Sequence, residues 1–204
     1  MTRRRRDLLP DEPARDVMVG VAAELFGDKG YHGTSVRDIS KQMGIQAGSL
    51  YAHIESKHDL LAEVLRRASA RAHAVLEPLE LANLPVRVKL TAVIETYLEF
   101  IRDAPNEARV SVHEFRWLTP EEQHEARVRR RRTQTIVERI IRAGVESGEL
   151  RPVDEKLVAT MIFSITNWGV EWYGPGRHGP ARQAREIVDV LIDGLGATQN
   201  LVRD

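Results

Sequence analysis

The chain has 204 residues, in which 30 Lys and Arg are balanced by 30 Asp and Glu, and it contains no Cys. This length corresponds to one or two domains and allows a sizeable core without disulfides. Without Cys there is no thiolate nucleophile and no Cys-ligated metal site, and an intracellular, cytoplasmic protein is favoured. The neutral balance gives no overall signal for nucleic acid, so such a partner has to be inferred from local residues.

The sequence predicts no membrane partner. Its longest apolar stretch, Leu157 to Val170, has 14 uncharged residues and includes Ser, Thr and Asn. That stretch is too short, because a transmembrane helix needs about 20 apolar residues. The basic residues near the start are followed by Asp, Leu and Pro rather than by an apolar run, so we expect no signal peptide.

Apolar residues recur at helical spacing along the chain, and Pro or Gly separates the helical segments. Capping boxes at Ser35 with Asp38 and at Ser56 with Asp59 mark two helix starts. The predicted helices cover residues 13–28, 35–43, 48–53, 57–77, 86–103, 106–117, 121–147, 154–173 and 181–196. The expected fold class is therefore all-α, with about nine helices.

The segment from Thr34 to Lys57 is the most informative part of the chain. Gly44 ends its first short helix, and a second short helix follows after three residues. Two short helices joined by a tight turn are the geometry that inserts the second helix into a DNA major groove. The core beneath them is predicted to contain Ile39, Met43, Ile45 and Leu50.

The side chains on the second short helix suit DNA contacts. Gln and His can bond base edges, Ala and Ser permit close approach, and Tyr can bond a phosphate. Those side chains are Gln46, Ala47, Ser49, Tyr51 and His53. A helix N-terminus at Thr34 and Ser35 favours one phosphate, and Lys57 is placed to hold another. The spacing fits equally well a helical hairpin in which Gly44 only caps a helix and Tyr51 and His53 pack in the core.

A resemblance to a known family lies in the block Ala23 to Ser40, followed by Met43-Gly-Ile, Gly48-Ser-Leu-Tyr, His53-Ile and Lys57-His-Asp-Leu-Leu. These residues resemble the N-terminal DNA-binding domain of TetR-type transcriptional repressors. Ile54 stands where the family usually has Phe, which is a conservative core change. The resemblance implies DNA contacts from Thr34, Ser35, Arg37, Gln46, Ala47, Gly48, Ser49, Tyr51, His53 and Lys57.

The same resemblance implies a homodimer that binds a palindromic operator and is released when a small hydrophobic molecule enters its C-terminal bundle. Residues 1–58 would form the N-terminal arm and the helix-turn-helix domain, and residues 59–204 the ligand-binding and dimerisation domain. The expected protein is thus a ligand-responsive regulator, with repression as its expected direction.

Two runs of Arg need separate interpretations. Arg3, Arg4, Arg5 and Arg6 form a cationic arm that can add phosphate or minor-groove contacts, and they fit a solvated tail equally well. The run 129–132 lies within a predicted helix, where four consecutive residues point around the whole circumference. Its main interpretation is a solvated stretch that pairs with nearby Glu residues, with one Arg able to reach an anionic ligand.

Polar and aromatic residues within apolar helices predict an effector pocket. For any single residue, plain core packing or a dimer surface is the simpler interpretation; the set as a whole is more informative. The set comprises His113, Arg116, Trp117, Ile162, Phe163, Asn167, Trp168 and Trp172.

The order of motifs in this half of the chain carries a second, looser resemblance. His113-Glu-Phe-Arg-Trp-Leu, a long Arg-rich helix, Asn167-Trp-Gly-Val-Glu-Trp-Tyr and a Gly-Pro-Gly loop follow one another. This order resembles TetR-type regulators that respond to acyl-coenzyme A thioesters in fatty-acid or steroid breakdown. It implies an acyl group among Trp117, Ile162, Phe163 and Trp168. Phosphates would be held by Arg116 or by one Arg of residues 129–132.

The last helix has an apolar stripe at helical spacing. Together with part of the 154–173 helix it predicts a four-helix interface with a second copy. Burial within one chain is the alternative, mainly for the earlier helix. The predicted interface contains Val158, Ile165, Gly169, Ile187, Val190, Leu191, Gly194 and Leu195.

Other function classes fit the sequence less well. The seven His are scattered, and neither a His-Glu-x-x-His pair nor a Gly-rich phosphate loop occurs. A metal site from His113 and Glu114 is disfavoured because adjacent helical side chains diverge. We therefore expect no enzyme, cofactor or metal. The remaining alternatives are a constitutive DNA-binding dimer without an effector and a small helical enzyme.

Overall fold

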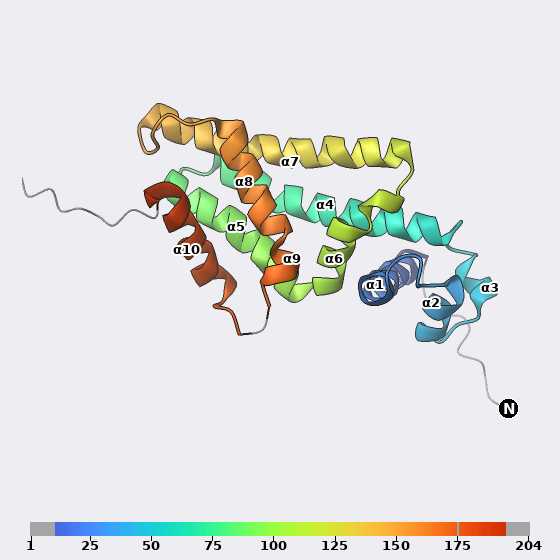
Figure 1. The fold of residues 1–204 in the computed structure, drawn as a ribbon. Helices are drawn as coiled ribbons and strands as arrows, with labels where there is room; N and C mark the ends of the chain where they lie inside the picture. The colour runs from blue at the N-terminus through green and yellow to red at the C-terminus, as the bar shows by residue number, and fades with distance from the viewer. Residues whose placement is uncertain (1–10, 175, 195–204) are drawn as a thin grey trace, which may run out of the picture. The chain divides into compact units, whose positions relative to one another are not determined.

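The computed structural model describes residues 11–174 and 176–194 (Figure 1). Every regular element in these ranges is helical, which confirms the all-α prediction. The Arg arm at positions 3–6 and Leu195 lie outside the described residues. The elements are α1 (Asp11–Lys29), α2 (Val36–Gln42), α3 (Ala47–Leu50), α4 (Lys57–Leu81), α5 (Val86–Asp103), α6 (Pro105–His113), the 3₁₀ helix η1 (Phe115–Trp117), α7 (Pro120–Ser147), α8 (Glu155–Asn167), α9 (Gly169–Trp172) and α10 (Pro180–Asp193).

Several predicted helices differ from the structure. The 48–53 prediction is too long, because α3 ends at Leu50 and residues 51–53 form a turn. The helix predicted to end at residue 77 continues through Pro78 to Leu81. The 106–117 prediction divides into α6 and η1, and the 154–173 prediction divides into α8 and α9. Apolar spacing does not detect such divisions, because positions three apart remain on one side in both α and 3₁₀ geometry.

The described residues form two compact units, one from residues up to 71 with residues 100–131, and one from residues 72–99 with residues 132–194. In the first unit α1, α2, α3 and the start of α4 pack with α6, η1 and the start of α7. Its core includes Met18, Phe26, Ile39, Leu50 and Leu61, all essentially inaccessible to solvent.

The two short helices α2 and α3 are fixed by local signals that the sequence predicts. The N–H of Asp38 donates to Ser35 Oγ over 3.1 Å, and the N–H of Ser35 donates to Asp38 Oδ2 over 2.8 Å. This reciprocal pair is the predicted capping box. Gly44 ends the first helix with φ of 69°, a conformation that glycine adopts without steric cost.

In the second unit, α7 contacts α4 and α8, while α5 contacts α8 and α10. Arg139 of α7 pairs with Glu80 of α4, and the Tyr97 and Phe163 rings of α5 and α8 meet edge to face at 5.6 Å. Arg87 of α5 donates to both Asp189 and Asp193 of α10, each over 2.6 Å. None of the helices in the described ranges is both long and apolar enough to cross a membrane.

Helices α1 and α6 approach each other closely at Gly27, and this contact predicts how substitutions in α1 change the free energy of unfolding. A Cβ built on Gly27 would lie 2.8 Å from the Asn106 Cα, whereas one on Gly20, in the same helix, meets none of the described atoms within 4 Å. Gly27→Ala is expected to lower the free energy of unfolding by about 1–3 kcal/mol. Gly20→Ala is expected to raise it by about 0.5–1 kcal/mol. Urea unfolding of both variants checks the difference, and equal stabilisation by the two would contradict it.

Candidate nucleic-acid interface and effector groove

Helix α3 has one face in the core and another toward solvent. Leu50 is fully buried, and Ile39 of α2 lies in the same core. Gln46, Gly48 and Ser49 are exposed, Tyr51 is 55% exposed, and Ala47 and His53 are half-buried. The hairpin alternative required Tyr51 in the core, and the exposure of Tyr51 removes that support. The exposed groups can reach base edges and phosphates.

Helix α2 presents its N-terminus through Ser35 and Arg37, both of which are exposed. Thr34 is different, since it is only 2% exposed. Its hydroxyl lies 3.0 Å from each of the carbonyl oxygens of Leu25 and Gly30 and bonds to them. The Thr34 side chain therefore fixes the turn between α1 and α2 from inside, and its hydroxyl is not presented at the surface.

Lys57, the first residue of α4, also turns inward. Its Nζ donates to the carbonyl oxygens of Tyr31 over 2.7 Å and Thr34 over 2.8 Å. It lies 4.1 Å from the centroid of the Tyr31 ring, in a cation–π arrangement. Burial lowers the pKa of Lys57 below its usual value. We call these contacts the Lys57 latch; they join the start of α4 to the turn that precedes α2.

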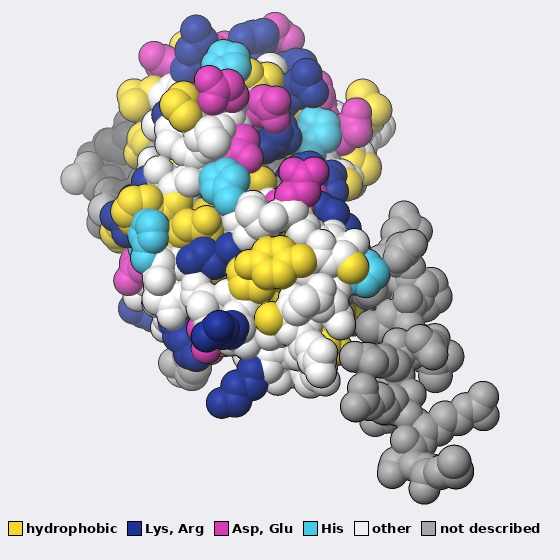
Figure 2. Space-filling model, turned by 90° about the vertical axis from the view of Figure 1, so that its right-hand side faces the viewer, with side chains coloured by type: hydrophobic (Ala, Val, Ile, Leu, Met, Phe, Trp, Pro, Cys, Tyr) yellow, Lys and Arg dark blue, Asp and Glu magenta, His cyan; other side chains and the backbone are white. Residues whose placement is uncertain are grey.

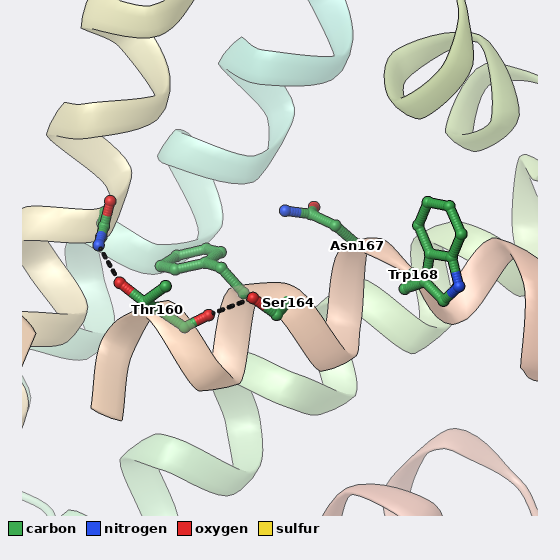
Figure 3. A pocket seen from close by; sticks show the side chains of 6 residues that line it. Thr160, Ser164, Asn167 and Trp168 are labelled. Carbon is green, nitrogen blue, oxygen red and sulfur yellow. Dashed lines mark hydrogen bonds between the residues drawn. The ribbon is translucent and has the colours of Figure 1, made fainter. Parts of the chain in front are cut away.

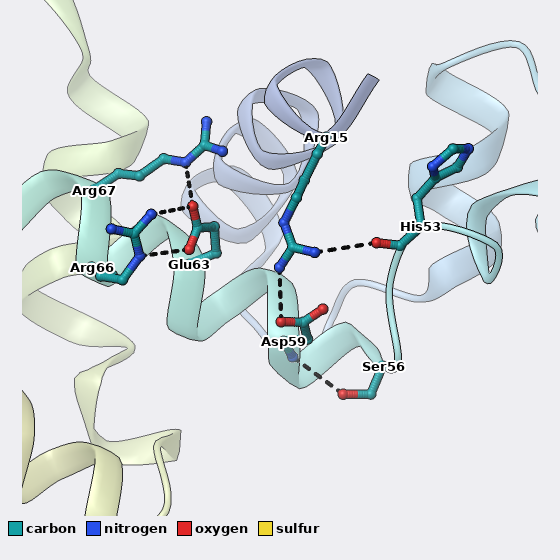
Figure 4. Close-up of polar contacts among 7 residues, drawn as sticks. All are labelled: Arg15, His53, Ser56, Asp59, Glu63, Arg66 and Arg67. Carbon is teal, nitrogen blue, oxygen red and sulfur yellow. Dashed lines mark hydrogen bonds and ion pairs between the residues drawn. The ribbon is translucent and has the colours of Figure 1, made fainter. Parts of the chain in front are cut away.

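A second set of polar contacts holds α1 to α4, as Figure 4 shows, and sequence reasoning missed it. Arg15 donates to Asp59 Oδ1 over 3.1 Å and to the His53 carbonyl over 3.3 Å, while the Asp59 N–H donates to Ser56 Oγ. The first turns of α1 thus contact the end of the recognition segment. Residue spacing in the sequence did not predict this ion pair, because Arg15 and Asp59 are far apart along the chain.

Further along α4, Glu63 binds two arginines (Figure 4). Hydrogen bonds from Arg66, assisted by Arg67, lower the pKa of Glu63 to about 2 against the opposing effect of burial. Arg67 also pairs with Asp16 of α1. These α4 cations therefore have carboxylate partners within the protein.

The charges are likewise mixed on the molecular face in Figure 2. Lys and Arg side chains are interspersed with Asp, Glu and His rather than gathered in one patch. Any attraction to phosphate on this face therefore depends on a few placed groups.

A groove lies between α7 and α8 in the second unit (Figure 3). It has a volume of about 390 Å³, within the usual range for ligand sites. Gln134 of α7 donates to Thr160 Oγ1 over 3.1 Å, and the Trp168 side chain is 57% exposed. The lining residues are Gln134, Thr160, Phe163, Ser164, Asn167 and Trp168.

The predicted pocket residues fall in different places. The groove brings together Phe163, Asn167 and Trp168, whereas Ile162 is fully buried and the Trp172 indole donates to the Ile165 carbonyl. His113, Arg116 and Trp117 belong to the other unit, where the Arg116 guanidinium lies 5.1 Å from the Trp117 ring centroid. Sequence reasoning missed Gln134, Thr160 and Ser164, although positions 160, 164, 167 and 168 have the spacing of one helical face.

The predicted interface residues are also only partly exposed. Val190 is exposed, Ile187 and Leu191 are half-buried on α10, Val158 and Ile165 are half-buried on α8, Gly169 is buried, and Gly194 is exposed. The structure adds two exposed apolar residues of α8 that the sequence reasoning missed, Leu157 and Met161. With Trp168, which directly follows α8, they stand at i, i+4 and i+11, so exposed apolar side chains share one side of α8 with the exposed Ser164.

Comparisons with known proteins identify the family. Residues 19–64 match the family described as bacterial regulatory proteins, tetR family, and residues 83–195 match a domain described as tetracyclin repressor-like, C-terminal domain. The chain is 31% identical over 199 residues to the HTH-type transcriptional repressor KstR2 of Mycolicibacterium smegmatis, covering 93% of this chain and 95% of that protein.

Solved structures of similar proteins support the same family. The TetR family transcriptional regulator PfmR from Thermus thermophilus is 28% identical, with a TM-score of 0.82 over 88% of this chain and 99% of its own. AibR, solved with isovaleryl coenzyme A and operator DNA, is 21% identical, with a TM-score of 0.77 over 88% of this chain and 98% of its own, which shows a shared fold. The chain therefore belongs to the TetR family of bacterial transcriptional regulators, which bind DNA and are not enzymes.

Proposed function

We propose that this regulator binds a palindromic operator as a homodimer and represses transcription until an effector releases it. The observation that carries the proposal is that α3 and its two cap residues are two-sided, with Gln46, Ser49 and Tyr51 exposed and Leu50 buried. Two copies of such a helix, related by a two-fold axis, read half-sites about one helical turn apart. The relative KstR2, which is 31% identical, is named a repressor, and this supports repression as the direction of regulation.

The proposed DNA contacts differ in how they act. Base and phosphate contacts are assigned to the exposed or half-buried residues of α3 and its flanks, and to Ser35 and Arg37 at the start of α2. Thr34 and Lys57 act from inside, by fixing the turn that positions α2. The direct contacts are Ser35, Arg37, Gln46, Ala47, Gly48, Ser49, Tyr51 and His53.

The test of operator binding is selection of duplexes from a pool of random sequence, followed by fluorescence anisotropy. We expect the purified chain to enrich a palindrome and to bind it as a dimer, measured by light scattering of the complex. Enrichment of no sequence would contradict operator recognition.

The arm at positions 3–6 is proposed to add phosphate contacts. Residues 1–58 carry nine Lys and Arg against eight Asp and Glu, and four of the nine are the arm. Deleting Arg3, Arg4, Arg5 and Arg6 is expected to lower operator affinity and to reduce the slope of log K against log salt by about 0.9 per lost phosphate contact. Anisotropy titrations at several KCl concentrations measure that slope. An unchanged slope would show that the arm makes no such contact.

The proposed homodimer uses α8 and α10. Helix α10 buries Pro180, Ala184 and Val188 within its own chain and leaves Val190 exposed on another side. Exposed apolar residues on α8 provide a second open face, and two such helices from each copy form a four-helix interface. Residues 59–204 are accordingly proposed as the ligand-binding and dimerisation domain, with residues 1–58 binding DNA.

The groove between α7 and α8 is the proposed effector site, and an acyl-coenzyme A thioester the proposed effector. Aromatic rings of Phe163 and Trp168 line it beside the polar side chains of Gln134 and Asn167. This mixture suits an acyl chain with a polar thioester end. The fold of this chain is shared with AibR, which was solved with isovaleryl coenzyme A.

Acyl-coenzyme A thioesters of different chain length are expected to dissociate the operator complex in a mobility-shift assay, and free fatty acids to do so less. Ser164→Trp fills the groove, so this variant is expected to bind operator normally and to lose the response. The lack of response of the wild-type protein to any thioester would contradict the effector assignment while leaving operator binding intact.

A further inference from the structure

Helix α4 begins with two residues whose side chains both bind other segments of the first unit. Lys57 forms the latch described above. Next to it, His58 Nε2 lies 2.6 Å from Glu122 Oε2, at the start of α7, and both side chains are about 30% exposed. The first turn of α4 therefore contacts the turn before α2 through one residue and the first turn of α7 through the next.

Glu122 is held in place by its own helix. Its Oε2 also accepts the Thr119 N–H over 2.8 Å, and the Glu122 N–H donates to Thr119 Oγ1 over 3.3 Å. This is a capping box at the start of α7. Burial raises the pKa of Glu122, but the hydrogen bonds from Thr119 and His58 outweigh burial and leave that pKa below its ordinary value. Glu122 is thus an anion at neutral pH in a fixed position.

Tyr31 connects these contacts to the turn before α2. Its ring meets the Phe26 ring at 5.4 Å and the His58 ring at 6.4 Å, and the Lys57 ammonium lies over it. A parallel contact joins the same turn to η1, where the rings of His32 and Trp117 lie 4.1 Å apart. The turn before α2 is therefore held against α4 and the α6–α7 connection, all within one compact unit.

We propose that His58 and Glu122 are positioning residues for operator binding. By tying the first turn of α4 to α7, they hold the Lys57 ammonium against the carbonyl oxygens that place the N-terminus of α2. Neither residue contacts DNA in this proposal. It rests on the operator binding proposed above and concerns residues outside the recognition helix.

The first test is a double-mutant cycle on affinity for the palindrome that the wild-type chain selects. His58→Ala and Glu122→Gln are each expected to weaken binding by about five- to tenfold, since each removes one hydrogen bond to a charged group. The double variant is expected to bind no more weakly than either single variant, because both remove the same contact. His58→Gln, whose amide can still donate to Glu122, is expected to restore most of the affinity.

His124→Ala is the matched control, because this histidine lies on α7 two residues after Glu122 and makes none of the contacts described for His58. It is expected to bind the palindrome as the wild type does. Because His58→Gln retains the bond, it remains a test if the alanine variant unfolds, as monitored by circular dichroism.

Rescue by the amide separates positioning from a merely structural role. The groups facing His58 are Glu122 from α7 and Tyr31 from the turn, with Lys57 beside it on α4 and His32 beyond the Tyr31 ring. A glutamine at position 58 replaces the imidazole but can still donate to the Glu122 carboxylate. Affinity is therefore expected to return with His58→Gln if the bond to Glu122 is what positions the turn, and to stay low if the imidazole ring only packs.

Additive losses in the cycle, wild-type affinity of both single variants, or failure of His58→Gln to restore affinity would each overturn the proposal. If the wild-type chain selects no duplex, operator binding itself fails and this proposal fails with it. The two failures are distinguishable, because the selection precedes every variant.

Discussion

Tyr51→Ala is expected to lower operator affinity by about ten- to a hundredfold while changing the free energy of unfolding by less than about 0.5 kcal/mol. The hydroxyl of Tyr51 is proposed to bond a phosphate, and hydrogen bonds to charged groups contribute about 1.5–3 kcal/mol. Its side chain is 55% exposed, so removing it opens little cavity in the core. Anisotropy with the selected palindrome and urea unfolding measure the two effects.

Tyr51→Phe is the control for this prediction, because it removes the hydroxyl and keeps the ring. A loss as large as that of the alanine variant assigns the effect to the hydrogen bond. Operator binding by Tyr51→Ala at wild-type affinity would contradict the placement of this face of α3 against DNA.

Leu50→Ala, one residue away, is expected to have the opposite profile. Leu50 is fully buried in the core that contains Ile39 and Phe26. Removing a buried leucine side chain costs about 2–5 kcal/mol, from lost transfer free energy and the cavity that remains. The midpoint of urea unfolding is expected to fall accordingly, while operator affinity is expected to stay near that of the wild type under conditions in which the variant is folded.

Leu50→Met is the matched control, since it nearly conserves volume and is expected to cost less than about 1.5 kcal/mol. A Leu50→Ala variant as stable as the wild type would show that α3 is not anchored by this side chain. Together, Leu50→Ala and Tyr51→Ala test whether the buried side of this segment supplies stability and the exposed side supplies DNA contact.

Local signals in the sequence predicted much of the fold, because they act over a few residues. The Ser35–Asp38 capping box and the glycine at position 44 depend only on neighbouring backbone, and both occur where spacing placed them. The division of the 154–173 prediction at Trp168 depends on local backbone geometry that apolar spacing does not report.

The site residues were harder to predict where a side chain has two possible directions. Lys57 stands at a helix start, where its ammonium can reach a phosphate or turn back to nearby carbonyl oxygens. The choice depends on Tyr31, which lies 26 residues earlier and is brought close only by the tertiary fold. The groove was hard to predict for the same reason. Gln134 and its hydrogen-bond partner Thr160 lie on different helices and come together only in the tertiary fold.

The division of α3 into two sides has a consequence for how such a regulator changes its target. Residues that anchor the helix, such as Leu50, are separate from residues that face solvent, such as Gln46 and Ser49. Substitutions on the solvent side carry little folding penalty. Operator preference can therefore diverge between gene copies, or be redesigned in a small library at these positions, while the scaffold is inherited unchanged.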